Sequence, residues 1–460
     1  MSEKRPFPNI ISFWKLLGPS FLVLAMGLGS GEVILWPYLV SQYGLGIAWG
    51  ALLGISMQFF VNMEIERYAL IKGESVFVGL FKKVKWSGGW FIFSTFVGFG
   101  LPGIVAASAK MVGHVFGVDQ YKYLAICFLI FMGLVLTLNQ SVYRTMETIT
   151  KLMIVICVPL ILLLVVIVVD GETWKALFGG LVGKGEGFRF LPHGISVATF
   201  LAAFAYSGAG GNLNLTQSIY IKEKGYGMGK YSQKLSGLLR KNEEVSIQMT
   251  GVDFEDNVES RLNFRKWWNM INMEHLIVFW GMGLLSMFLL MLLSYSTTFG
   301  KTSSEGISFV IDQANSISLL YGGLVGAAVL FVLGLLLFQT QMGILDSTSR
   351  IMGENLALIR GAGDGRKMNL SRIYFMFVWL QVVFGVVLFL MDYKEPRFLI
   401  VLGAVINAFA MLVHVILVRY LNQITFKGVF ATSLWRKIIL LVVIAFFAFF
   451  SVYNIYTSVF

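Results

Sequence analysis

Long apolar runs separated by short polar segments make up most of this chain. Eleven of these runs approach or exceed the roughly 20 residues that an α-helix needs to cross a bilayer. They lie near 14–43, 46–70, 89–115, 121–138, 148–169, 194–221, 270–296, 317–345, 373–391, 397–421 and 434–458. The pattern predicts an all-α membrane protein with about eleven transmembrane helices.

Lys and Arg are distributed unevenly over the two sides that eleven helices would define. With a cytoplasmic N-terminus, 28 of the 36 basic residues fall on the cytoplasmic side and 7 on the outer side. Such an excess is typical of cytoplasmic loops. We therefore predict an integral protein of the plasma (inner) membrane, in contact with the lipid bilayer, with its N-terminus in the cytoplasm. The net charge of +11 is then explained by the membrane topology, and we expect no nucleic-acid partner.

The composition excludes several other classes of protein. Hydrophobic residues make up 57% of the 460 residues and charged residues 13%, against about 25% charged in soluble domains. Two cysteines and four histidines are too few for a disulfide framework or a histidine-rich metal site. The chain shows no nucleophile–base set, so we expect neither an enzyme nor a cofactor.

The chain reads as a single membrane domain, residues 1–460. Its longest polar stretch, 222–266, mixes acidic and basic residues and ends at two tryptophans. We expect this stretch to be a cytoplasmic loop with a short amphipathic helix at the membrane interface.

Two glycine clusters interrupt apolar segments at corresponding places. One covers residues 25–32 and ends in Glu32; the other covers 205–212 and ends in Asn212, 180 positions further along. Each glycine disfavours a helix by roughly 1 kcal/mol, and unwound backbone at membrane depth is tolerated where it lines protein or a wet cavity. Close helix packing through small residues is the alternative explanation, but it does not account for the ionisable Glu32.

Each cluster opens a group of five segments, 14–169 and 194–421, and an extra helix follows at 434–458. Interrupted helices at matching positions in two halves indicate a transporter built from inverted repeats, with its binding site near the membrane midplane. We therefore expect a 5+5 inverted repeat whose first and sixth helices are unwound in mid-membrane.

Three stretches resemble the Nramp family of metal-ion transporters, which has the leucine-transporter fold. Gly18-Pro19-Ser20-Phe21-Leu22-Val23 followed by Gly29-Ser30-Gly31-Glu32 is similar to the family's first helix, with its D-P-G-N motif. The stretch 209–216 matches the sixth helix at Asn212, Leu213 and Leu215, and 333–339 resembles the eighth. The resemblance covers roughly the first ten segments and implies this fold and a metal cation as substrate.

The chain departs from the family at the positions that the resemblance makes most important. The family's metal ligands on helix 1, an Asp and an Asn, correspond to Gly29 and Glu32, and the Met ligand on helix 6 corresponds to Ala209. The helix 6 His that is linked to proton movement corresponds to Gly211, and the acid of helix 3 falls near Pro102 and Gly103. The soft sulfur ligand is therefore absent.

We accordingly expect the substrate site at Gly29, Ser30, Gly31, Glu32, Ala209, Gly210, Gly211, Asn212 and Asn407, with Glu32 and Asn212 as metal ligands. Oxygen ligands favour hard ions, so a secondary active transporter of a divalent ion such as Mg²⁺, in preference to Mn²⁺ or Fe²⁺, is the sharpest hypothesis. H⁺ or Na⁺ is the possible coupling ion. The alternatives are a carrier of a small organic or amino-acid-like solute and a non-transporting membrane sensor.

Other polar residues in the apolar segments have weaker claims to function. Gln58 is a minor candidate for the site, and Asp346 is placed to pair with Arg350 one helical turn on. Glu64 and Glu66 lie beside Arg67 near a helix end, where we expect a structural ion pair. The four histidines lie near segment ends, which favours positions at the membrane interface.

Overall fold

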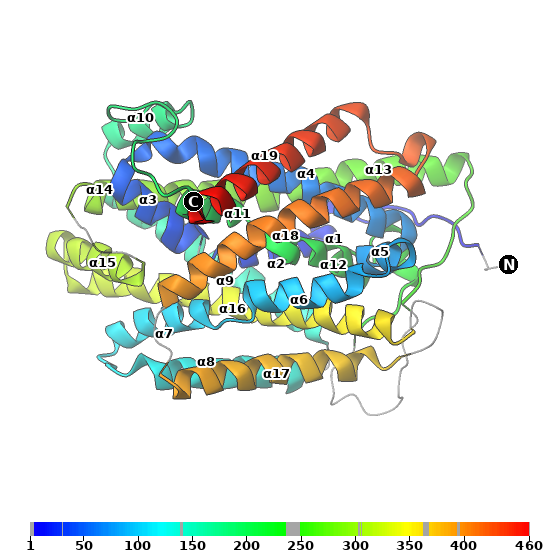
Figure 1. Cartoon of the computed structure of the whole chain (residues 1–460), viewed down its shortest axis with the longest axis horizontal. Coiled ribbons are helices and arrows are strands. Elements are labelled where there is room, and N and C mark those ends of the chain that lie inside the picture. Colours follow the sequence, from blue (N-terminus) through cyan, green and yellow to red (C-terminus); the bar gives the residue numbers. More distant parts are fainter. Residues whose placement is uncertain are drawn as a thin grey trace.

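The computed structural model describes residues 4–29, 31–138, 141–235, 249–301, 304, 306–361, 368–392 and 396–459. In this part of the chain the helices run mostly along one common direction, and the two termini lie at opposite ends of the bundle (Figure 1). The predicted all-α architecture is confirmed.

Most of the continuous long helices follow the apolar runs, whereas the one that begins at Val258 starts in the polar stretch 222–266. They are α4 (Ala48–Lys72), α8 (Tyr121–Leu138), α9 (Val142–Val168), α13 (Val258–His275), α14 (Gly283–Thr298), α16 (Gly323–Ile359), α17 (Leu370–Leu390), α18 (Pro396–Thr425) and α19 (Leu434–Val459). A π-helical turn, Leu276–Met282, joins α13 to α14. Short helices that the hydrophobic pattern did not predict are α5 (Val76–Lys83) and α10 (Gly171–Gly180). Helix α1 (Phe13–Leu16) lies at the start of the predicted run 14–43, and α15 (Ile307–Tyr321) ends inside the predicted run 317–345.

Two apolar segments are broken, as predicted. The first broken helix consists of α2 (Pro19–Gly27), a π-helical turn (Gly31–Leu35) and α3 (Trp36–Tyr43). The second broken helix consists of α11 (Val197–Ala205), a 3-10 turn (Gly211–Leu215) and α12 (Thr216–Lys224). The residues that separate the halves come from the two glycine clusters.

Nine helical spans within the described ranges are long and apolar enough to cross a membrane. The first broken helix, whose halves are bent by 41° to each other, makes a tenth. The remaining predicted segment, 194–221, is the second broken helix. It is interrupted between Ala205 and Gly211, and its second half ends in Lys222, Glu223 and Lys224, so it lacks one long apolar stretch.

Two predicted segments differ in detail from the observed helices. The run 89–115 is divided into α6 (Ser87–Phe99) and α7 (Gly103–Val115), because Pro102 has no N–H to donate and disfavours a continuous helix. The polar stretch 222–266 contributes helix at both ends, since α12 continues to Lys224 and α13 begins at Val258. Residues 236–248 of this stretch lie outside the described part.

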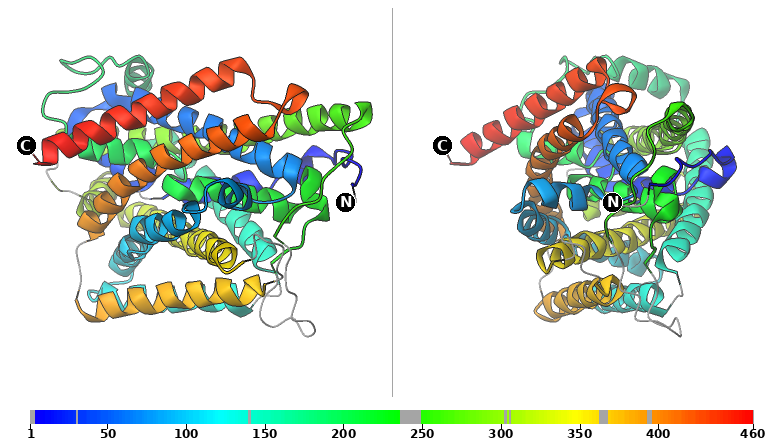
Figure 2. Two further views of the ribbon diagram at one scale, coloured as in Figure 1. Left: turned by 45° about the vertical axis from the view of Figure 1, so that its right-hand side comes forward. Right: turned by 90° about the vertical axis from the view of Figure 1, so that its right-hand side faces the viewer.

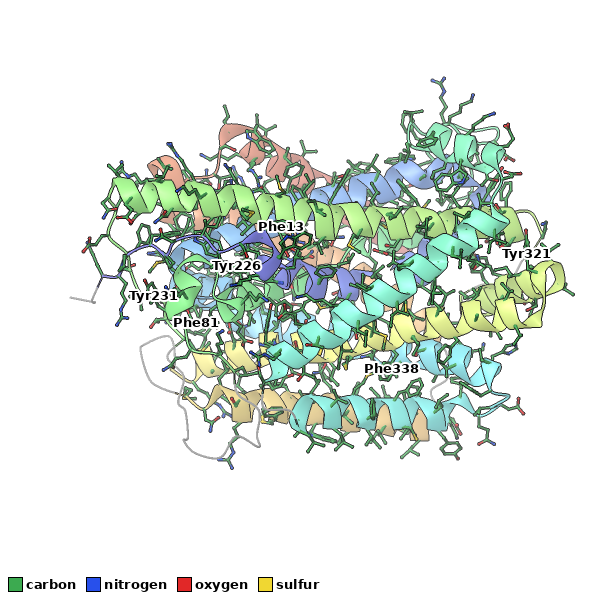
Figure 3. All side chains as sticks on the ribbon, turned by 180° about the vertical axis from the view of Figure 1, so that it is seen from behind. Phe13, Phe81, Tyr226, Tyr231, Tyr321 and Phe338 are labelled. Carbon is green, nitrogen blue, oxygen red and sulfur yellow. The ribbon has the colours of Figure 1, made fainter. Side chains whose placement is uncertain are left out.

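Helix α16 lies at the centre of the bundle and packs against α2, α6, α7, α9 and α17. Helices α8 and α17 lie side by side along one edge of the bundle, and α19 lies on the opposite edge (Figures 1 and 2). Leu152, Val155, Leu163 and Val166 of α9 are exposed, and Figure 3 shows α9 crossing the back of the bundle. Exposed apolar faces of this extent suit contact with lipid chains.

Candidate functional site

The breaks in the two helices contact each other in the interior of the bundle. A Cβ atom at Gly27 would lie 2.9 Å from the carbonyl carbon of Gly208, and one at Gly31 would lie 2.1 Å from the carbonyl oxygen of Tyr206. Side chains at these positions would therefore separate the two segments. The glycine clusters therefore allow close packing of the two segments and also lie where the helices unwind. Both explanations given for the sequence pattern, unwinding and close packing, apply.

Thr340 of α16 satisfies backbone groups that the first break leaves without helical partners. Its hydroxyl lies 2.8 Å from the carbonyl oxygen of Ala25 and 3.0 Å from that of Leu28. A Cβ atom at Gly29 would lie 2.5 Å from the Thr340 methyl carbon. Carbonyls freed at a helix end need such donors when they are buried. Residue Ser30, predicted to belong to the site, lies outside the described residues.

Gln58 of α4 performs the same task at the second break. Its amide nitrogen donates to the carbonyl oxygen of Ala205 at 2.9 Å, and its amide oxygen accepts from the backbone N–H of Gly210 at 3.1 Å. The same oxygen accepts from the side chain of Asn214 at 3.3 Å. One side chain thus spans the whole gap between α11 and the 3-10 turn, where Gly210 and Gly211 adopt φ values of 74° and 48°.

Glu32 begins the second half of the first broken helix and is completely buried. Its Oε2 atom accepts a hydrogen bond from Ser286 of α14 at 2.8 Å, whereas Oε1 has no hydrogen-bond partner in the described structure. A buried carboxylate with a free oxygen is costly unless a cation or proton compensates it.

Asn212 and Asn407 lie on another side of the second break. Asn212 donates to Ser94 and Thr95 of α6 at 2.8 and 3.1 Å. Asn407 of α18 donates to the carbonyl oxygen of Gly98 and to the hydroxyl of Tyr206, both at 3.0 Å. The Oδ1 atom of Asn407 would lie 2.3 Å from a Cβ atom at Gly211, so Asn407 occupies the space that glycine leaves.

The predicted site residues therefore gather at the two breaks but bond to different neighbouring helices. Glu32 bonds to α14, and Asn212 bonds to α6. Ala209 is buried in the gap between α11 and the 3-10 turn. Among the described residues, no group of three or more His, Cys, Asp or Glu side chains is arranged to hold a metal ion.

Three of the predicted residues, and Asn214 beside them, carry a buried oxygen atom without a hydrogen-bond partner in the part of the chain that the structure describes. These atoms are Glu32 Oε1, Asn212 Oδ1, Asn214 Oδ1 and Asn407 Oδ1. Each belongs to a side chain that is fully buried. Buried acceptors without donors are uncommon in proteins, and carboxylate and amide oxygens are the ligands that hard cations prefer.

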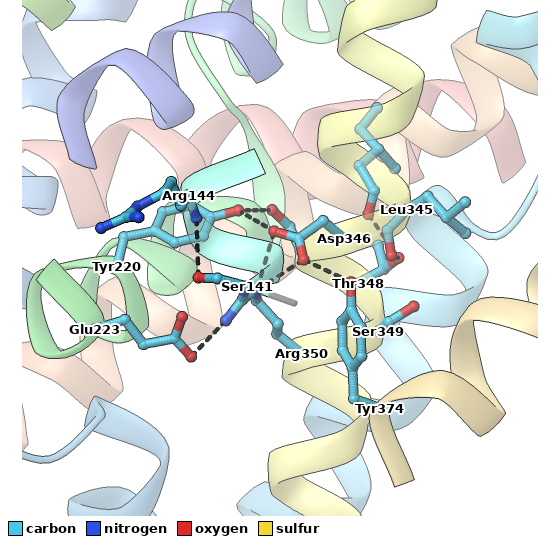
Figure 4. A network of polar contacts seen from close by, with 12 residues as sticks. Ser141, Arg144, Tyr220, Glu223, Leu345, Asp346, Thr348, Ser349, Arg350 and Tyr374 are labelled. Carbon is cyan, nitrogen blue, oxygen red and sulfur yellow. Dashed lines mark hydrogen bonds and ion pairs between the residues drawn. The ribbon is translucent and has the colours of Figure 1, made fainter. Parts of the chain in front are cut away.

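Buried ion pairs fix the second half of the second broken helix to α16, at the end of the bundle that carries the N-terminus. Arg350 bonds to Asp346 at 2.8 Å, as predicted, and to Glu223 of α12 at 2.7 Å; the hydroxyls of Tyr220 and Tyr374 donate to Asp346 (Figure 4). Lys222 of α12 also pairs with Glu354 at 2.9 Å. The predicted pair of Glu64 and Arg67 is present at 2.8 Å.

Sequence reasoning missed several residues at the breaks and misplaced two histidines. The sequence did not single out four hydroxyl residues, Thr340, Ser286, Ser94 and Tyr206. A single hydroxyl in an apolar segment does not reveal which residue of another helix it will bond to. His275 and His414 are fully buried, against the expectation of interfacial positions, whereas His114 and His193 are exposed. A histidine near the end of an apolar segment is buried when neighbouring helices cover that end, as they do for His275 and His414.

Comparisons with known proteins show similarity at the level of structure. No protein-family model matches the chain, and no curated protein matches it in sequence. A point mutant of the Eremococcus coleocola manganese transporter superposes with a TM-score of 0.71 at 13% identity, covering 99% of this chain and 89% of that one. The same transporter in complex with an aromatic bis-isothiourea compound gives 0.69 at 13% identity, with 99% and 89% covered.

A second kind of transporter shows the same architecture at lower similarity. MhsT in complex with L-phenylalanine superposes with a TM-score of 0.51 at 12% identity, covering 96% of this chain and 98% of that one. The chain therefore has the leucine-transporter-like fold that these transporters share.

Proposed function

We propose that this protein is a secondary active transporter, a divergent relative of the Nramp family, that moves a hard divalent cation such as Mg²⁺ by alternating access. The observation that carries the proposal is the contact between two broken helices beside buried oxygen atoms that lack partners, Glu32 Oε1 above all. Midplane sites formed by discontinuous helices are typical of such carriers.

In this proposal Glu32 supplies the negative charge that a divalent cation needs. Asn212 and Asn407 supply neutral oxygens, and the unwound segments supply backbone carbonyls. Because Glu32 and Asn212 bond to different helices in the structure, one or both side chains change partner when the substrate binds. The absence of a thioether at Ala209 removes the ligand that favours softer transition metals.

The family relationship, the coupling and the membrane orientation belong to the same proposal. The fold similarity to the Eremococcus coleocola manganese transporter supports the kinship with a metal carrier. The excess of Lys and Arg on the side of the N-terminus supports a cytoplasmic N-terminus and insertion in the plasma membrane.

Uptake into proteoliposomes tests the proposal directly. We expect uptake of Mg²⁺ by the intact protein and a loss of at least about tenfold, equivalent to ~1.4 kcal/mol, in Glu32→Gln. Glu74→Gln is the matched control, because Glu74 is also a buried carboxyl but bonds to Tyr68 and Lys82, away from the breaks.

Three outcomes contradict the proposal in different ways. Uptake of an amino acid and of no metal would assign the fold to an organic solute. Mg²⁺ uptake that Glu32→Gln leaves unchanged would remove Glu32 from the site. Uptake of neither class by a correctly folded protein would favour the non-transporting sensor.

A further inference from the structure

A second group of buried polar side chains lies apart from the breaks, near the end of the bundle that carries the N-terminus. Four helices contribute to this Glu66–Glu274 cluster. Its members, all fully buried, are Ser20 of α2, Glu66 of α4, Gln217 of α12, and Glu274 and His275 of α13. Helices α2 and α12 are the halves of the two broken helices that reach this end.

The members of the cluster form one continuous chain of contacts. Ser20 donates a hydrogen bond to Glu274, and its oxygen lies 2.8 Å from Nδ1 of His275. The same Nδ1 lies 3.3 Å from Oε1 of Glu66, which also accepts from the amide of Gln217. The cluster thus joins α2 and α12 to α4 and α13.

Four polar atoms of this cluster have no hydrogen-bond partner in the described structure: Glu66 Oε2, Glu274 Oε1, His275 Nε2 and Gln217 Oε1. The imidazole of His275 is stacked between Phe59 and Phe279, with ring centroids at 5.5 and 4.6 Å. Polar atoms without partners in such a closed, aromatic-lined place call for a physical explanation, and a bound proton or ion is one such explanation.

The charges around the cluster leave its two carboxyls incompletely compensated. Glu66 and Glu274 repel each other, Arg436 attracts Glu66, and Lys224 attracts Glu274. Both cations have other acidic partners: Arg436 lies 3.6 Å from Glu64, and Lys224 lies 2.6 Å from Glu147. Further titratable or charged groups near these residues are Arg67, Tyr143, Glu223 and Tyr226.

Two ionised, buried carboxyls with a neutral imidazole would be strongly unfavourable. A single added proton, on a carboxyl oxygen or on His275 Nε2, turns this repulsion into attraction along the chain of contacts. The polar atoms already contact one another directly, which suits a proton and leaves little room for the several oxygen ligands of Na⁺.

We propose that the Glu66–Glu274 cluster binds a proton and acts as a latch that holds α2 and α12 against α4 and α13. The bound proton closes this end of the bundle. Its release to water on that side restores the repulsion between the two carboxyls and frees the half-helices to move. The inference rests on the proposed transport function, because it couples proton binding to opening of one side.

The test compares intact protein with Glu274→Gln and Glu66→Gln in proteoliposomes, with Mg²⁺ or Mn²⁺ as substrate. Gln imitates the protonated carboxyl. Because this end of the bundle then stays closed, we expect each variant to lose at least about tenfold both of metal exchange without a gradient and of the uptake driven by an inward proton gradient. A pH-sensitive dye inside the vesicles should report a matching loss of proton entry, and Glu74→Gln should behave as the intact protein.

Infrared difference spectra recorded across a pH titration test the latch without any transport. We expect a protonated-carboxyl band in the intact protein that Glu274→Gln or Glu66→Gln removes and Glu74→Gln retains. If neither substitution changes this band, the proton site is wrong even where transport is intact. If the band behaves as expected but no solute is carried, the transport function fails and the proton site stands.

Two further outcomes overturn the latch. Gradient-driven uptake in Glu274→Gln and Glu66→Gln equal to that of the intact protein would separate the cluster from coupling. Uptake driven by a Na⁺ gradient and indifferent to pH would assign coupling to Na⁺ and leave the cluster a structural role.

Discussion

At Gly31 the absence of a Cβ atom is a packing requirement, because the carbonyl oxygen of Tyr206 occupies the space that a methyl group would need. This carbonyl oxygen belongs to the backbone, which cannot rotate away as a side chain can. The need for glycine at position 31 of the first broken helix is thus imposed by Tyr206 of the second broken helix, 175 positions further along the chain.

Gly31→Ala should therefore destabilise the protein and impair transport. A Cβ atom 2.1 Å from the Tyr206 carbonyl oxygen must push the two segments apart, and overpacking of this kind costs typically 1–3 kcal/mol, so about that loss is expected. Thermal unfolding in detergent measures it. Gly89→Ala, on the same membrane domain but with nothing within 4 Å of the added atom, should leave the melting temperature unchanged or raised.

Gln58→Leu should cost about 2 kcal/mol or more in stability. The substitution keeps the volume but leaves the Ala205 carbonyl and the Gly210 N–H without their partners, and each unsatisfied buried group costs roughly 1–3 kcal/mol. Thermal unfolding and uptake assays check the result. Ser316→Ala is the control, since that hydroxyl bonds to a carbonyl of its own helix; an equal effect of both substitutions would contradict the role of Gln58.

At the scale of elements, the two half-helices near the N-terminal end are held by different chemistry. Helix α12 is tied to α16 by Arg350 with Glu223 and by Lys222 with Glu354, and α2 is tied to α13 through Ser20. Buried ion pairs have a high cost when one partner is removed.

Arg350→Met should destabilise the bundle by roughly 3–5 kcal/mol, because it leaves Asp346 and Glu223 buried without their cation. Glu223→Gln should cost less, since Arg350 then keeps Asp346. Denaturation monitored by light scattering or fluorescence ranks the two variants. Arg261→Met, which breaks an exposed pair with Asp256, should not shift the midpoint; equal midpoints for all three variants would contradict the element-level role.

At the scale of the whole molecule, charge and fold define two ends of one bundle. The N-terminus, α5, α12 and the start of α13 gather at one end, and α10 and α15 lie at the other (Figure 1). The basic residues of α5 and α12 belong to the first end, and the proposed orientation puts this end in the cytoplasm.

Cysteine labelling should reveal this sidedness in intact cells. In a background with Cys127 and Cys157 replaced by Ser, Lys175→Cys on α10 should react with a membrane-impermeant maleimide. Lys82→Cys on α5 should react only after permeabilisation, because a cytoplasmic thiol is shielded by the bilayer. The reverse pattern would invert the proposed orientation.

The chain's local pattern was enough to predict the helices and the places where two of them break. Apolar runs of membrane-spanning length and glycine clusters at 25–32 and 205–212 act on backbone conformation within a few residues, so their effect can be read along the sequence. The pairs Asp346 with Arg350 and Glu64 with Arg67 were predictable for the same reason, since one helical turn brings them together.

Contacts between distant segments depended on how the helices pack in three dimensions. The partners of Glu32, Asn212 and Gln58 are Ser286, Ser94 and the Ala205 carbonyl, and the Glu66–Glu274 cluster joins side chains from four helices. Helix periodicity sets which face a residue occupies, but the neighbour on that face depends on the packing of every other helix. The sequence by itself therefore determined the spans and the breaks, whereas the tertiary structure decided which of the described buried polar groups are paired and which are not, because pairing depends on how all the helices pack.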